Sequence, residues 1–200
     1  MNTLLQQAPA PGFADLVFDA QHSFRAVLDA LARPGTVHHA GQELTAPAPL
    51  SPSATALALT LFDHDTTVWL DPSARSDATA AFLKFHCGCP LTDSIAEAGF
   101  GLIADPASMP PLASFAQGED RYPDSSATLI LELPSFESGE PVTLRGPGIE
   151  TCSVITPQGL PDNFWIWMAL NQAQFPLGVD IILTCGTAMI GLPRSVEAEV

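Results

Sequence analysis

The chain has 200 residues and a formal net charge of −15 at pH 7, from 22 acidic and seven basic side chains. Such a chain has no basic stripe to displace counterions, which excludes direct binding to nucleic acid or to an anionic membrane. No run approaches the ~18 consecutive apolar residues that span a bilayer, and no basic residue precedes an apolar block at the N-terminus. We therefore expect a cytoplasmic protein. Charged residues make up only 14% of the chain and apolar residues 46%, which favours coverage of some apolar surface by other subunits.

The order of the predicted elements indicates an α/β protein. We expect a flexible N-terminal arm over residues 1–17 and one domain over residues 18–200. In chain order, the pattern predicts a helix at 19–32, a strand at 36–40, helices at 53–62 and 76–86, a strand at 99–104, a short helix at 109–116, strands at 127–133 and 141–149, a helix at 161–174, and strands at 179–185 and 188–192. A further strand is expected at 67–70, and Ser53 is expected to cap the second helix.

Alternation of helices and apolar strands in the first part of the chain, followed by hairpins, predicts a three-layer sandwich around a mixed sheet. We expect residues 127–133 and 141–149 to be joined by a Ser-Gly turn, and the last two strands to form a hairpin at Gly186-Thr187.

The first helix has a charged face and an apolar face. On a helical wheel His22, Arg25, Asp29 and Arg33 gather opposite Phe24, Val27, Leu28 and Leu31. One interpretation is a solvated face with i,i+4 ion pairs. The other is contact of His22 and Arg25 with an anion or a partner carboxylate, because Arg binds carboxylates in a bidentate manner.

A chemically rich segment ends the third helix, where Lys84 precedes Cys87 and Cys89. Lys84 is the only lysine, so a Schiff-base mechanism would have to use it. A Cys-x-Cys disulfide is strained and no second Cys pair follows, so buried free thiols are expected. Asp63, His64 and Asp65 are too few for a complete metal site, and we expect no metal.

The turn Arg145-Gly146-Pro147-Gly148 follows a predicted strand. Backbone amides beside an arginine can hold a phosphate, which makes Arg145, Gly146 and Gly148 candidate ligand-binding residues. The turn lacks the Lys-Ser/Thr of a P-loop, and a tight structural turn is the alternative.

The helix segment 164–170 is apolar all round for two turns, which predicts burial on every side. In so short a chain this favours a subunit interface anchored by Trp165 and Trp167.

Taken in order, several segments resemble one family, the H subunit of the bacterial carbon–phosphorus lyase system (PhnH). The matching residues are 18–25, 31–35, 59–61, 65–66, 68–70, 85–86, 90–91, 127–131, 144–149, 175–186 and 193–194. The resemblance covers nearly the whole chain from Phe18 onward.

The resemblance implies an α/β homodimer whose fold is similar to a reduced pyridoxal-phosphate-dependent transferase, with no cofactor of its own. It also implies assembly with the G, I and J subunits into a core complex that transfers a ribose 5-triphosphate unit from ATP to an alkylphosphonate and releases adenine. The J subunit, a radical iron–sulfur enzyme, then cleaves the carbon–phosphorus bond. No catalytic residues are assigned to the H subunit, so we expect a subunit that supports catalysis.

Two alternatives come from other classes of protein. One is a stand-alone small-molecule enzyme of pyridoxal-phosphate ancestry that uses Lys84. The other is a thiol redox module on Cys87 and Cys89.

Overall fold

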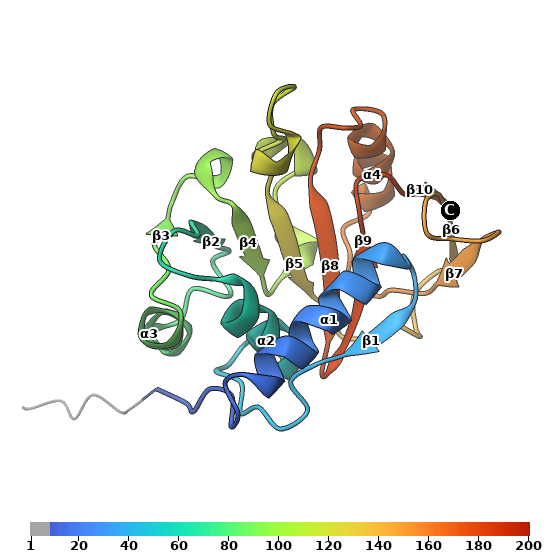
Figure 1. The fold of residues 1–200 in the computed structure, drawn as a ribbon. Helices are drawn as coiled ribbons and strands as arrows, with labels where there is room; N and C mark the ends of the chain where they lie inside the picture. Colours follow the sequence, from blue (N-terminus) through green and yellow to red (C-terminus); the bar gives the residue numbers. More distant parts are fainter. Residues whose placement is uncertain (1–8) are drawn as a thin grey trace, which may run out of the picture.

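The computed structural model describes residues 9–200, so the first eight residues of the expected N-terminal arm lie outside the described residues. The chain folds into four α-helices and two sheets over these residues (Figure 1). The helices are α1 (Phe18–Ala32), α2 (Pro52–Leu61), α3 (Asp77–His86) and α4 (Phe164–Gln172). The strands of the main sheet are β1 (Val37–His39), β2 (Val68–Leu70), β3 (Leu91–Thr92), β4 (Phe100–Ile103), β5 (Thr128–Glu132), β8 (Asp180–Cys185) and β9 (Ala188–Leu192). A small sheet contains β6 (Val142–Arg145), β7 (Ser153–Ile155) and β10 (Glu197–Glu199).

The main sheet is mixed, with the order β1-β9-β8-β5-β4-β2-β3. Strand β9 pairs antiparallel with both β8 and β1, whereas the other neighbouring pairs are parallel. The carboxyl ends of the parallel strands therefore meet at one edge. The predicted mixed-sheet α/β class is confirmed, whereas the likeness to pyridoxal-phosphate-dependent transferases stays a prediction.

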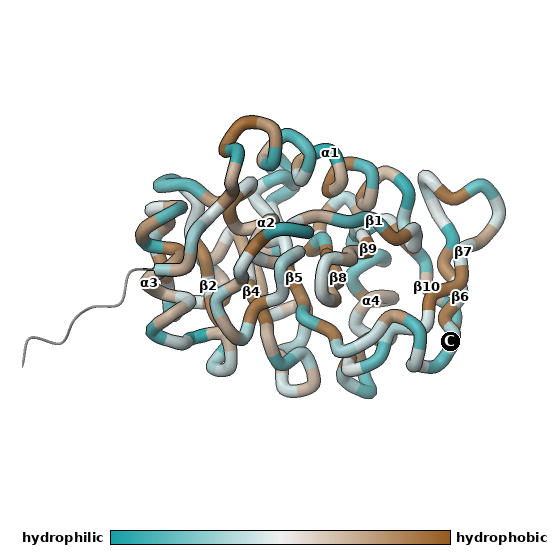
Figure 2. Tube along the Cα trace, turned by 90° about the horizontal axis from the view of Figure 1, so that it is seen from below, coloured by the Kyte–Doolittle hydropathy of each residue, from teal (hydrophilic) through white to brown (hydrophobic). Residues whose placement is uncertain are grey.

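Two hydrophobic cores lie on opposite faces of the main sheet. In β5, Leu129 and Leu131 enter one core and Ile130 enters the other, since successive side chains of a strand point to opposite faces. Helices α1, α2 and α3 cover the face of Ile130, and α4 covers the other face together with the small sheet. Figure 2 shows hydrophobic residues along the central strands. The sheet is therefore the middle layer of the fold.

The N-cap of helix α2 lies two residues before the predicted cap, Ser53. Ser51 is the N-cap, and its Oγ accepts a hydrogen bond from the amide of Ala54 at 3.2 Å. Pro52 occupies the first helical position, where a missing N–H removes no helical hydrogen bond. The prediction of Ser53 as the cap was wrong, because Pro52 starts the helix instead of extending the loop.

The Ser-Gly segment joins the strands expected at 127–133 and 141–149 in the chain, but the two strands do not pair with each other. Strand β5 lies in the middle of the main sheet between β4 and β8, whereas β6 lies in the small sheet between β10 and β7. Burial explains the difference, because Leu129, Ile130 and Leu131 are fully buried and need cover on both faces.

The predicted short helix at 109–116 is reduced to a 3-10 turn, Leu112–Ser114. Pro110 and Pro111 lack backbone N–H groups, so an α-helix cannot extend through this position. Similar single turns are present at Ile95–Glu97, Pro106–Ser108 and Pro123–Ser125.

The described part of the expected N-terminal arm contacts the domain. The carbonyl oxygen of Ala10 lies 2.9 Å from Nε2 of His86, and the half-buried Phe13 packs against the core under α1 and α2. The boundary between arm and domain stays a prediction.

Candidate functional surfaces

The carboxyl edge of the parallel strands carries two carboxylates with different surroundings. Asp71, directly after β2, is buried, and its Oδ1 accepts hydrogen bonds from the amides of Ala74 at 2.8 Å and Ala104 at 2.9 Å. This carboxylate ties the end of β2 to the end of β4. Its hydrogen-bonding capacity is used within the chain, which indicates a structural role.

Glu132, the last residue of β5, is the less satisfied of the two. Its Oε1 accepts a hydrogen bond from the amide of Ser51 at 2.6 Å, across 81 residues of sequence. Burial raises the pKa of this carboxyl, and the hydrogen bond to Ser51 only partly offsets the effect. A carboxyl that holds its proton more strongly than usual can act as an acid or a base.

The sequence analysis missed Glu132. The available signal was an acidic residue at the end of the apolar run 128–131, where a carboxyl end of a buried strand is expected to reach a functional edge. Its neighbour Cys185 ends β8 at the same edge, and burial together with the charge of Glu132 raises the pKa of the Cys185 thiol.

A groove of about 600 Å³ opens beside this edge. Cys185, Ala188 and Ile190 lie along it, as do His39 of β1 and Glu137. Neither Lys nor Arg is among its lining residues. The groove therefore presents apolar and acidic groups, which suits a triphosphate poorly.

The arginine of the candidate phosphate-binding turn already has partners within the chain. Arg145 is half exposed, its Nη1 donates to the carbonyl oxygen of Thr151 at 3.1 Å, and its Nε lies 3.8 Å from Oε2 of Glu199. Gly146 and Gly148 both have positive φ angles, 135° and 84°. The structure thus brings the three candidate residues together in one tight turn, and binding of a phosphate there stays a prediction.

The candidate face of α1 is exposed. Arg33 forms an ion pair with Asp29, whereas among residues 9–200 no carboxylate lies within 4 Å of Arg25. His22 lies beside Asp19 and Glu43 along a pocket of about 480 Å³. Arg25 is therefore available to a partner carboxylate.

The predicted apolar face of α1 is only partly buried. Phe24 and Leu28 are 46% and 51% exposed, because α1 contacts the sheet through the smaller side chains of Ser23, Val27 and Ala30. Gly191 of β9 explains this choice, since a Cβ there would lie 2.5 Å from the carbonyl oxygen of Ala30. Phe24 and Leu28 are one helical turn apart and form an exposed apolar surface, which we call the α1 stripe.

The prediction that α4 is buried on every side was wrong. Phe164 and Met168 are buried and Trp165 and Trp167 are half-buried against the core, but Ile166 and Leu170 are each 61% exposed. We call Ile166 and Leu170 the α4 stripe. Residues 166 and 170 are one helical turn apart, so the stripe is a continuous face of α4.

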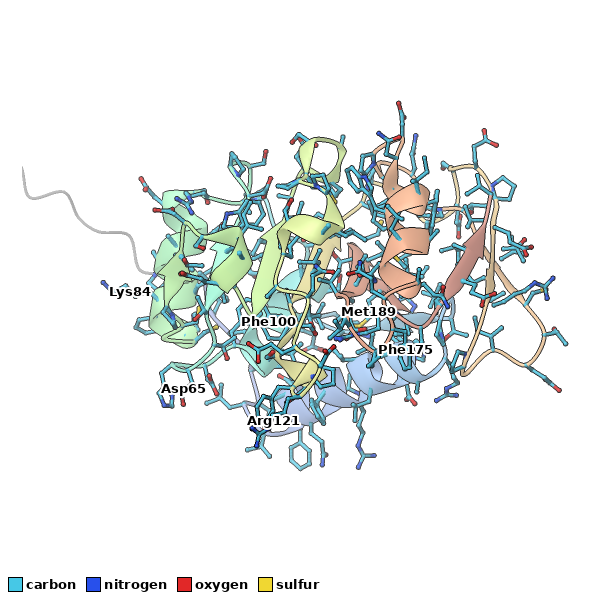
Figure 3. The ribbon with its side chains drawn as sticks, turned by 90° about the horizontal axis from the view of Figure 1, so that it is seen from above. Asp65, Lys84, Phe100, Arg121, Phe175 and Met189 are labelled. Atoms are coloured by element: carbon cyan, nitrogen blue, oxygen red, sulfur yellow. The ribbon has the colours of Figure 1, made fainter. Side chains whose placement is uncertain are left out.

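The residues of the two alternative mechanisms have unfavourable surroundings. Lys84 is exposed in the last turn of α3 and points away from the molecule (Figure 3), whereas Schiff-base lysines are activated in apolar pockets. Burial, assisted by Cys89, raises the pKa of Cys87 to about 12, which disfavours a reactive thiolate. All four cysteines are free, but only Cys89 is buried, so the prediction of buried thiols holds for one of them.

Two further properties concern the described residues alone. Over residues 9–200, no three side chains of His, Cys, Asp or Glu converge in a way that could hold a metal ion. The same part of the chain has no helix long and apolar enough to cross a membrane.

Comparison with known proteins finds similarity over nearly the whole chain. Residues 11–199 match the family described as "Bacterial phosphonate metabolism protein (PhnH)". The chain belongs to the PhnH family. It is 42% identical over 197 residues, 98% of both chains, to "Alpha-D-ribose 1-methylphosphonate 5-triphosphate synthase subunit PhnH" of Rhizobium meliloti (strain 1021).

A second relative matches a shorter part of the chain. The chain is 36% identical over 78 residues to "Putative C-P lyase subunit protein HtxG" of Stutzerimonas stutzeri, which covers 39% of this chain and 40% of the relative. The names of both relatives describe subunits of larger assemblies. The family resemblance found in the sequence is confirmed.

Proposed function

We propose that the chain is the H subunit of a carbon–phosphorus lyase core complex and supports transfer of a ribose 5-triphosphate unit from ATP to an alkylphosphonate, with release of adenine. The observation that carries this proposal is the 42% identity over 98% of both chains to a subunit of a ribose 1-methylphosphonate 5-triphosphate synthase. The chain then acts in the cytoplasm, without a cofactor of its own.

The surface of the chain supports a role in assembly. The α1 stripe and the α4 stripe lie on opposite faces of the main sheet, because α1 and α4 pack on different cores. Exposed apolar patches of this kind mark protein contacts. Two separate stripes suit a chain that contacts a second copy of itself through one face and the G, I and J subunits through others.

Arg25 adds a polar contact to the α1 stripe. It projects from the same helix as Phe24 and Leu28 and has no carboxylate partner within residues 9–200. In a chain of net charge −15, such an arginine suits an acidic residue of a partner. His22 and Arg25 then fix the register of the contact rather than its affinity.

The chain offers one candidate for binding the triphosphate. Arg145 is half exposed beside two glycines with positive φ angles, and turns of this kind present backbone amides to anions. The neighbouring Glu199 opposes an anion at this position. The triphosphate is therefore bound mainly by other subunits, with Arg145 as a contributor.

Growth on methylphosphonate as the sole phosphorus source tests the proposal. Deletion of the gene in its native host abolishes this growth and leaves growth on phosphate unchanged, and a plasmid copy restores it. Growth of the deletion strain on methylphosphonate at the normal rate would contradict the function.

Two variants separate the roles of the Arg145 turn. Arg145→Ala abolishes growth on methylphosphonate while the complex still assembles, if Arg145 binds a ligand. Arg121→Ala is the matched control, because Arg121 stacks at 5.4 Å on the exposed Tyr122. Loss of assembly in Arg145→Ala would show that the turn is structural.

A further inference from the structure

Two terminal strands flank the groove described above. Strand β1 is the last strand of the main sheet, and β7 is the last strand of the small sheet. Both figures place β7 beside the β1 end of the molecule (Figures 1 and 2). Val37 and His39 of β1 lie along one side of the groove, and Val154 and Ile155 of β7 along the other.

The two strands start from a common point. A Cβ at Gly35, just before β1, would lie 2.5 Å from Oγ of Ser153, the first residue of β7. Gly35 has a φ of 80°, so the backbone turns at this contact before β1 begins. Gly35 and Ser153 therefore bring the start of β1 and the start of β7 together.

The hydrogen-bond pattern shows which amides of β1 are free. The amide of Ala40 donates to the carbonyl oxygen of Thr187 at 2.9 Å, and the register pairs His38 with Met189. Hydrogen-bonded and non-hydrogen-bonded pairs alternate along an antiparallel ladder. His38 therefore bonds to β9, whereas the N–H and C=O groups of Val37 and His39 point away from it.

The side chains around these free groups are apolar with one charge. Val37 is 50% exposed and Val154 is 59% exposed, which is unusual for valine. Ala188 and Ile190 lie beside them in the groove. Glu137 is the charged lining residue, and the groove has no Lys or Arg to neutralise it.

We propose that this groove binds an extended segment of a partner subunit, which adds as a strand to the free edge of β1. The backbone of the segment bonds to Val37 and His39, its apolar side chains contact Val37 and Val154, and a Lys or Arg faces Glu137. Strand addition of this kind takes its affinity from backbone hydrogen bonds and its specificity from alternate side chains. Since β1 is about 10 Å long, the segment pairs over three to five residues.

This inference rests on the proposed function, because the partner is another subunit of the complex. Unpaired edges are normally kept short or protected against unwanted pairing. β1 has three residues, so its exposed edge is short enough to be tolerated in the free chain and long enough for a partner strand.

Hydrogen exchange resolved to single amides tests the inference. In the free chain, the amides of Val37 and His39 exchange fast and the amide of His38 exchanges slowly. In the complex with the G, I and J subunits, exchange at Val37 and His39 slows at least about tenfold, and His38 is the internal control. A complex that forms with unchanged exchange at Val37 and His39 would overturn the inference alone, whereas failure of the complex to form would overturn the proposed function and this inference with it.

A pair of variants at Val37 tests the backbone contact independently. Val37→Pro removes only the outward N–H, which does not bond to β9, and proline is tolerated at sheet edges. Val37→Thr keeps the N–H and the β-branched shape. We expect the affinity for the partner subunits to fall at least about tenfold in Val37→Pro and less than about threefold in Val37→Thr. Equal affinities of the two folded variants for the partner subunits would contradict the inference. If Val37→Pro fails to fold, the hydrogen-exchange measurement on the natural chain tests the inference instead.

Discussion

Gly148 and Ala32 lie so close that no side chain fits between them: a Cβ at Gly148 would lie 2.1 Å from the carbonyl oxygen of Ala32. The contact joins the turn after β6 to the C-terminal end of α1. Gly148 is thus required for packing, whatever the role of Arg145 three residues earlier. Two segments of the family resemblance that are distant in the sequence, 31–35 and 144–149, therefore touch in the fold.

Substitution of Gly148 is predicted to destabilise the folded chain. Gly148→Ala adds a steric clash to an unfavourable positive φ of 84° and lowers the free energy of unfolding by about 3 kcal/mol or more. Gly88→Ala is the matched control, since Gly88 has a φ of 66° and open space around it, and costs about 1–2 kcal/mol. Urea unfolding measures both. Equal losses would show that the contact with Ala32 relaxes freely.

The ion pair between Arg194 and Asp180 is the best satisfied in the described chain. Nη2 of Arg194 lies 2.6 Å from Oδ2 of Asp180, and Nε lies 3.2 Å from Oδ1. The remaining donors bond to the carbonyl oxygens of Pro123 and Pro176 and to Oγ of Ser126. One side chain therefore connects residues 123–126 and 176–180 to the segment after β9.

Loss of this side chain is predicted to destabilise the fold. Arg194→Ala leaves the partly buried carboxylate of Asp180 without its cation and lowers the free energy of unfolding by about 2–4 kcal/mol. The exposed pair of Arg33 with Asp29 is the control, and Arg33→Ala costs less than about 1 kcal/mol. Thermal unfolding of the two variants at one protein concentration compares them. A cost for Arg194→Ala as small as that of the control would contradict a structural role.

The raised pKa of Glu132 predicts a dependence of stability on pH. Above the ordinary value of 4.5 the unfolded chain releases a proton that folded Glu132 still holds. The contribution of Glu132 to the free energy of unfolding therefore falls as pH rises above 4.5, until folded Glu132 also ionises.

Glu132→Gln removes this titration. We compare the free energy of unfolding of the variant with that of the natural chain, by urea unfolding at about pH 4 and at about pH 7.5. The difference, variant minus natural chain, is expected to be more positive at about pH 7.5. If the difference between variant and natural chain is the same at both pH values, burial does not disfavour the charge of Glu132.

Thiol reactivity follows from the surroundings of the cysteines. Because the pKa of Cys87 is raised to about 12, iodoacetamide at about pH 8 alkylates it at least about 100-fold more slowly than the exposed Cys152. Mass spectrometry of peptides follows each site, and unfolding in urea equalises the rates. Fast alkylation of folded Cys87 would revive the interpretation of a thiol redox module.

Local patterns predicted the elements whose signals are contained in a few residues. Gly186-Thr187 between two apolar runs predicted the hairpin of β8 and β9, and the pattern at 76–86 predicted α3, whose N-cap is Ser76. In both, a turn or cap residue lies beside the periodic run that it delimits. The family resemblance was confirmed because many such segments occur in a fixed order.

The sequence could not predict which elements meet across long separations. Nothing near β6 indicates that it leaves the main sheet, and nothing near Ser51 indicates the hydrogen bond to Glu132. The wheel of α1 identified an apolar side correctly, but the close approach of Gly191 to Ala30 turned a different side toward the core. These properties depend on tertiary contacts, which periodicity does not contain.

The two stripes predict how assembly can be disrupted. Leu170→Glu and Phe24→Glu place a charge on the α4 stripe and on the α1 stripe at exposed positions, so the free chain stays folded. Phe85→Glu is the control, because Phe85 is 71% exposed on α3, outside both stripes. We expect at least one stripe variant to weaken association about tenfold or more, since charges at the centre of an interface are strongly disfavoured. Association of both stripe variants at the level of the control would exclude the stripes as contact surfaces.

Co-expression of the chain with the G, I and J subunits, followed by purification on a tag of the chain and native mass measurement, tests the central claim most directly. The account predicts one species that contains all four subunits, with a mass far above the 21.1 kDa of the chain alone. A chain that is folded and abundant but elutes without the other subunits would contradict it.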